Sequence, residues 1–119
     1  MRLLVGVNGS ERALGGLEEV VDRARQAGDE LTVAVYSSDD AVAATEEAVR
    51  DRLETLDVDA TVETVTGQPG SRLVELAETD DYDRIVLSGG QTSPLGKIQF
   101  DSVIEFVLLN AHTTVTLIR

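Results

Sequence analysis

Hydrophobic residues along the chain form short unbroken runs that alternate with longer stretches of helical spacing. Unbroken runs are typical of strands that are covered on both faces of a sheet. Three such runs and the last stretch of the sequence are predicted to be strands: residues 3–7, 31–36, 85–87 and 113–118. Residues 59–66 differ, because Val62 alternates with polar and charged neighbours. This pattern predicts a fifth strand with one wet face, near the edge of the sheet.

The stretches between these strands have the periodicity of amphipathic helices. The first begins at Ser10 and has its apolar positions at Ala13, Leu14, Leu17, Val20, Val21 and Ala24. Gly28 is its expected C-cap, and the internal pair Gly15-Gly16 predicts close packing of the helix backbone. The other three helices have these predicted core positions: Val42, Val49, Leu53 and Leu56; Leu73, Leu76 and Ala77 after Pro69; Val103, Phe106 and Val107 in residues 102–110.

The order of elements, βαβαβαβαβ, predicts an α/β fold. We expect a doubly wound, five-stranded, mostly parallel sheet with right-handed crossovers and helices on both faces, in a Rossmann-like arrangement. The 119 residues fit one domain, residues 1–119, with no internal repeat or linker.

Composition excludes several kinds of site. The chain has no cysteine, which excludes disulfide frameworks, zinc ribbons, iron–sulfur clusters and thiol nucleophiles. His112 is the single histidine, so we expect neither a multi-histidine metal site nor a Ser-His-Asp centre. The apolar runs are too short to span a bilayer and no secretory signal is visible, which predicts a soluble, cytoplasmic protein that does not bind membranes.

The charge is strongly acidic and unevenly distributed. Acidic residues number 22 against 10 basic ones, a formal net charge of −12, which argues against nucleic-acid binding. Lys97 is the only lysine, and a lysine-poor, carboxylate-rich surface suits a cytoplasm with molar salt, so we expect a halophile origin. Residues 1–83 carry 20 acids and 7 bases, net −13, whereas residues 84–119 carry 2 acids and 3 bases, net +1. Burial, a subunit interface or an anionic ligand would each disfavour carboxylates in the last third.

Two loops that leave predicted strand ends have the glycines that a bound phosphate requires. Their candidate residues are Asn8, Gly9 and Ser10 in the first loop and Gly89, Gly90, Gly96 and Lys97 in the second. Glycines let the backbone approach an anion, and the helix that follows adds N–H donors. Strand-end loops also carry glycines for turn geometry alone, so this pattern leaves both interpretations open.

The standard phosphate-binding motifs are absent. A P-loop fails because five residues separate Gly90 from Gly96 and Ile98 follows Lys97, which leaves no hydroxyl for magnesium. The first turn lacks the third glycine of the dinucleotide fingerprint. A phospho-acceptor receiver domain would need acidic residues where Asn8 and Thr66 stand.

Over essentially its whole length the chain resembles a universal stress protein. The matching stretches are Leu-Val-Gly-Val-Asn-Gly-Ser-Glu at 4–11, Gly67-Gln68-Pro69, Ile-Val-Leu-Ser-Gly-Gly at 85–90, Phe-Asp-Ser-Val at 100–103 and Val-Thr-Leu-Ile at 115–118. The resemblance implies a five-stranded parallel sheet related to the adenine nucleotide alpha hydrolases, and a dimer.

The ATP-binding branch of that family carries the motif Gly-x2-Gly-x9-Gly-Ser/Thr. Without gaps its positions fall on Ser88, Gln91, Asp101 and Ser102, of which Ser102 alone matches. The family's aspartate after the first strand is Asn8 here. A carboxylate at Asp101 would repel a phosphate.

Tyr36, at the end of the second strand, has two interpretations. It could stack on an adenine, or it could be a core residue with its hydroxyl at the rim.

The sequence leaves two functions open. The first is a non-catalytic, homodimeric stress-response or adaptor protein with a degraded nucleotide-binding motif, no cofactor and protein partners of unknown identity. Its dimer would form through the C-terminal strand, whose edge needs cover. The alternative is a stress sensor that binds an adenine nucleotide, ATP or AMP, with slow ATP hydrolysis.

Overall fold

The computed structural model describes residues 1–8, 11–36, 41–88, 91–92, 98–99 and 102–118. Five strands form one sheet in the order β3-β2-β1-β4-β7. The strands are β1 (Arg2–Val7), β2 (Glu30–Val35), β3 (Thr61–Thr64), β4 (Arg84–Ser88) and β7 (Thr114–Ile118). The helices are α1 (Glu11–Ala27), α2 (Val42–Thr55), α3 (Pro69–Thr79) and α4 (Ser102–Asn110). All neighbouring pairs in this sheet are parallel, which confirms the predicted α/β fold.

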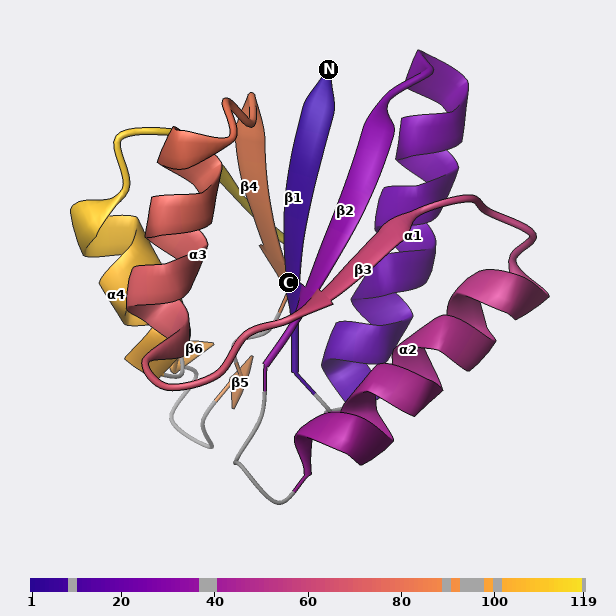
Figure 1. The fold of residues 1–119 in the computed structure, drawn as a ribbon, viewed down its shortest axis with the longest axis horizontal. Coiled ribbons are helices and arrows are strands. Elements are labelled where there is room, and N and C mark those ends of the chain that lie inside the picture. The colour runs from indigo at the N-terminus through magenta and orange to yellow at the C-terminus, as the bar shows by residue number, and fades with distance from the viewer. Residues whose placement is uncertain (9–10, 37–40, 89–90, 93–97, 100–101, 119) are drawn as a thin grey trace.

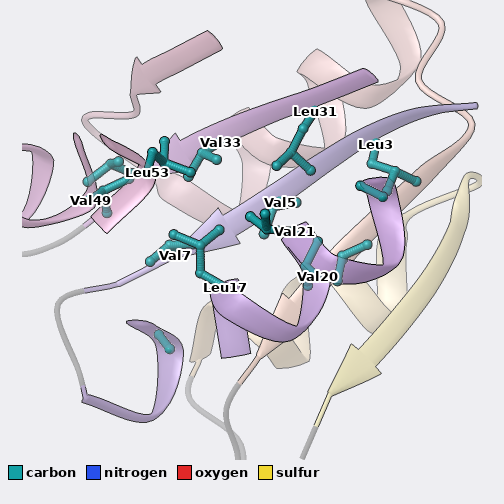
Figure 2. Packing of buried hydrophobic residues seen from close by; sticks show 14 residues of the cluster. Leu3, Val5, Val7, Leu17, Val20, Val21, Leu31, Val33, Val49 and Leu53 are labelled. Carbon is teal, nitrogen blue, oxygen red and sulfur yellow. The ribbon is translucent and has the colours of Figure 1, made fainter. Parts of the chain in front are cut away.

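The helices form a layer on each side of the sheet, with α1 and α2 on one face and α3 and α4 on the other (Figure 1). On the first face, alternate residues of β1 and β2 pack against α1 and α2 (Figure 2). The buried members of this cluster include Leu3, Val5 and Val7 of β1 and Leu17, Val20 and Val21 of α1. The residues between them point to the other face, where Leu4 joins Leu73 and Ile104. The continuous apolar runs therefore form strands that are buried on both faces, as predicted.

The first helix has the predicted core face and the predicted end. Gly28 has a φ of +72°, a left-handed conformation that favours glycine, and the N–H of Asp29 donates to the carbonyl of Ala24 at 2.9 Å. Of the glycine pair, Gly16 is tightly packed: a Cβ built there would lie 2.5 Å from the Cβ of Ser88. A Cβ on Gly15 would meet nothing within 4 Å, so the predicted close packing holds for one of the two glycines.

The last helix differs from the prediction in the face it buries. Phe106, predicted to point into the core, is 40% exposed, and Ile104 is buried with Val107 instead. The reason is the neighbouring helix, because Phe106 lies against Gly70 at the start of α3, where a Cβ would come within 2.9 Å of the phenylalanine Cβ. Because apolar residues lie on several sides of α4, the sequence pattern did not identify the side that faces the sheet.

The fold has three further features besides the packing of its main helices and strands. A short antiparallel pair consists of β5 (Gln91–Thr92), which lies in the loop predicted over residues 88–97, and β6 (Ile98–Gln99), which directly follows it. Strand β3 occupies one edge of the sheet, as its alternating pattern predicted, and β7 occupies the other. No helix of the described residues is long and apolar enough to cross a membrane.

Candidate functional site

The carboxyl ends of β1, β2 and β4 lie side by side, and the order in which successive strands are added to the sheet reverses at β1. Strand β1 has β2 on one side and β4 on the other, so the chain segments that follow β1 and β4 lead to helices on opposite faces of the sheet. In open parallel sheets a ligand binds beyond the strand ends at such a point, because the loops there separate. The short pair β5–β6 and the starts of α3 and α4 lie at the same end of the sheet (Figure 1).

Three of the nine predicted site residues fall within the described parts of the chain. These are Asn8, Tyr36 and Ser102. The other six lie outside them: Gly9, Ser10, Gly89, Gly90, Gly96 and Lys97. Asp101 is outside them as well.

Asn8 and Tyr36 follow neighbouring strands at the carboxyl edge. Asn8 is half-buried directly after β1, and the N–H of Tyr36 donates to the carbonyl of Val7 at 3.0 Å. The side chain of Tyr36 is 5% exposed and belongs to the cluster on the α3–α4 face, together with Leu73 and Leu87. The ring thus has the surroundings of a core residue.

Ser102 is the first residue of α4 and is exposed at a hollow between the starts of two helices. This α3–α4 hollow has a volume of about 310 Å³ and is lined on the other side by Gly67, Gln68, Pro69, Gly70 and Ser71. Pro69 stands in the first turn of α3, as predicted, and the Gln68 side chain makes no capping hydrogen bond there. The first turn of α3 contains no acidic residue. Backbone N–H groups at such a helix start can donate to an anion.

Ser88, which stands at the first glycine of the ATP-binding motif, has a packing role that the sequence analysis missed. Its side chain is 4% exposed, and its hydroxyl donates to the carbonyl of Ala13 at 3.3 Å. Alternate residues of β4 point to α1, so Ser88 faces away from the α3–α4 hollow. Gly16 provides the space for it, and the Gly15-Gly16 pair was the signal in the sequence.

The described residues contain no group of three or more histidine, cysteine, aspartate or glutamate side chains that could hold a metal ion. His112 is exposed just before β7.

Comparison with known proteins gives one family and a set of similar folds. The sequence model of the universal stress protein family matches residues 1–119. No curated protein sequence is significantly similar to the chain.

Among solved structures, universal stress protein UspA from Lactobacillus plantarum has a TM-score of 0.82 at 23% identity, covering 100% of this chain and 97% of that one. A universal stress protein in complex with cAMP has a TM-score of 0.78 at 24% identity, covering 99% and 95%. The universal stress protein from Archaeoglobus fulgidus in complex with dAMP has a TM-score of 0.76 at 21% identity, covering 100% and 98%. At these identities the likeness shows a shared fold.

Proposed function

Because the chain belongs to the universal stress protein family, we propose that it is a non-catalytic, homodimeric stress-response protein that acts through its surfaces as an adaptor. The observation that carries this proposal is the edge strand β7. It pairs with β4 on one side, contains no charged residue within Thr114–Ile118, and keeps most of its side chains half-buried. The unpaired N–H and C=O groups of an uncharged edge strand can form hydrogen bonds with a strand of another chain.

The helix α4 also has exposed apolar side chains. On α4, Phe106 is 40% exposed, Leu108 is 42% exposed and Leu109 is 84% exposed. Apolar side chains gathered on one helix are typical of a surface that meets another protein. Antiparallel pairing of two β7 strands across a two-fold axis would extend the sheet through both protomers.

Adenine-nucleotide binding is the second candidate. Two observations favour it: similar structures were solved in complex with cAMP and dAMP, and Ser102 borders a hollow at two helix starts. In this case the protein would report the adenylate level, with slow ATP hydrolysis as an accompanying activity. The site would use Ser102, Lys97 and the glycines of the two loops. Tyr36 would contribute at its edge if its ring moved.

One titration separates the two candidates. The protein is purified in high potassium chloride, because a net charge of −12 is least repulsive there, and light scattering confirms the dimer. Calorimetry with ATP follows, after acid-quenched protein has been checked for a co-purified nucleotide. Silence at millimolar ATP supports the adaptor, whereas micromolar affinity or a stoichiometric adenylate replaces it with the nucleotide sensor.

A pair of variants sharpens this result. If an empty anion site remains, Asp101→Gly removes a repulsive carboxylate, and ATP affinity rises. Asp51→Gln, on the exposed face of α2, removes the same charge elsewhere and controls for general electrostatics. Equal affinities for both variants would count against a nucleotide site.

A further inference from the structure

A second hollow lies on the other face of the sheet, between α1 and the edge strand β7. Its volume is about 260 Å³. It exists because α1 packs over β1, β2 and β4, while β7 lies one strand further out. On the opposite face, Val115 and Leu117 of β7 pack against the cluster that includes α3 and α4. We call this space the α1–β7 hollow.

The floor of the α1–β7 hollow is apolar. Leu3, Val20 and Val86 line it and are buried members of the core cluster, and Ile118 packs against their edge. Leu3 and Val20 lie towards the same end of this cluster (Figure 2). A small aliphatic group placed here would contact side chains that already exclude water.

A half-buried arginine, Arg84, stands at this apolar floor. Arg84 lines the hollow, and its Nε is buried and has no hydrogen-bond partner among the residues that the structure describes. The neighbouring charges are engaged elsewhere. Arg23 pairs with Glu19 at 2.9 Å, and Asp29 accepts from the amino group of Met1 at 3.0 Å. A buried donor without an acceptor is unfavourable, and the guanidinium to which this Nε belongs can donate its other N–H groups to an acceptor from outside the chain.

The chemistry of the ligand follows from these two features. A guanidinium presents its N–H donors in a planar fork that matches a carboxylate. The apolar floor next to it suits a short hydrocarbon chain, and the carboxylate of Asp29 at the rim opposes a ligand with several negative charges. We propose that the α1–β7 hollow binds a small aliphatic monocarboxylate, with its carboxylate on Arg84 and its chain on Leu3, Val20, Val86 and Ile118.

This site is separate from the nucleotide site proposed above, and it lies beside the β7 edge proposed for the dimer, since Thr116 and Ile118 line it. The α3–α4 hollow at Ser102 and the α1–β7 hollow lie on opposite faces of the sheet. If ATP does not bind, the proposal of the carboxylate site is unaffected. If hexanoate does not bind, the proposal of a nucleotide site is unaffected.

The test uses hexanoate and hexan-1-ol as paired probes, because they share a chain and differ in the carboxylate. Methyl NMR at constant ionic strength follows Leu3, Val20, Val86 and Ile118 during each titration. We expect saturable shifts with hexanoate at concentrations at which hexan-1-ol causes none. Absence of shifts, or equal shifts with both probes, would overturn the proposal.

Two variants assign the binding to Arg84. Arg84→Met keeps the apolar stem and removes the guanidinium, and it should weaken hexanoate binding about tenfold or more. Arg72→Met is the control, because Arg72 is an exposed arginine on α3 that pairs with Glu75 at 3.2 Å, and it should bind hexanoate like the parent protein.

Thr116→Ile tests the space itself while Arg84 stays in place. Thr116 lines the hollow from β7, and the larger side chain should weaken hexanoate binding by a similar factor. This variant decides the question if Arg84→Met does not fold. Unchanged affinity in Thr116→Ile would place hexanoate outside the hollow and overturn the proposal.

Discussion

The two edge strands of the sheet differ in length, charge and cover. Strand β3 has four residues, and Thr61, Glu63 and Thr64 are exposed. Strand β7 has five residues without a charge, and four of them are half-buried. A short edge that carries a charge resists pairing with another chain, whereas a longer uncharged edge allows it.

The charges around the two edges follow the same division. The residues up to 83, which include β3, carry a net charge of −13, and the residues from 84 onward, which include β4, α4 and β7, carry +1. In the sequence this asymmetry left burial, an interface and an anionic ligand open as explanations. In the structure the low-charge region contains the exposed Leu108 and Leu109, which complete burial does not explain. The comparison shows one edge that is charged and mostly exposed and another that is uncharged and mostly half-buried.

The largest effect should come from breaking the β7 edge. We expect Leu117→Pro or Val115→Pro to convert the dimer to a folded monomer, because proline lacks the N–H that a paired strand needs. Light scattering measures the mass, and circular dichroism confirms the fold. Val62→Pro, on the opposite edge, is the matched control and should remain dimeric. A folded β7 variant that stays dimeric would refute this interface.

A smaller effect should come from the close contact between Gly16 of α1 and Ser88 of β4. Gly16→Ala places a methyl group 2.5 Å from the Cβ of Ser88, and we expect a loss of about 1–3 kcal/mol in the free energy of unfolding. Urea unfolding in high salt provides the measurement.

The neighbouring glycine is the control for this prediction. Gly15→Ala meets nothing within 4 Å in the same helix, and we expect a gain of roughly 0.5–1 kcal/mol, because alanine favours helix over glycine. Equal effects of the two substitutions would show that Ser88 does not constrain α1.

The smallest effect should come from neutralising one carboxylate in the acidic region up to residue 83 and one in the region from residue 84 onward. Glu63 on β3 and Glu105 in the first turn of α4 are both exposed. Removing Glu63 relieves repulsion on the acidic side, so Glu63→Gln should raise the unfolding temperature in low potassium chloride. Glu105 lies near the positive start of its helix, so Glu105→Gln should lower it. Shifts of the same sign would contradict the division of charge between the sides.

The sequence predicted the order of the main elements and most of the core, because buried strands and amphipathic helices leave clear periodicities. It did not predict β5 and β6, since strands of two residues have no period to detect. The sequence also predicted Phe106 rather than Ile104 in the core, because apolar residues lie on several sides of α4 and the contact of Phe106 with Gly70 is not visible in the sequence.

The candidate site could be predicted less well than the fold. Strand ends in the sequence suggested Asn8 and Tyr36, and the family's motif suggested Ser102, but burial distinguishes them: Tyr36 lies in the core and Ser102 is exposed. The partnerless Nε of Arg84 had no signal in the sequence, because it depends on α1 ending its cover one strand short of β7.

The contact between Gly16 and Ser88 also limits how this sequence can drift. A lineage that changed Gly16 to alanine first would meet the serine side chain, whereas one that changed Ser88 to glycine first would free the space for a later alanine. The order of mutations therefore matters, and the two positions should vary together among descendants of this gene. Glycine at position 88, where the ATP-binding motif has it, is the change that would make room for alanine at position 16.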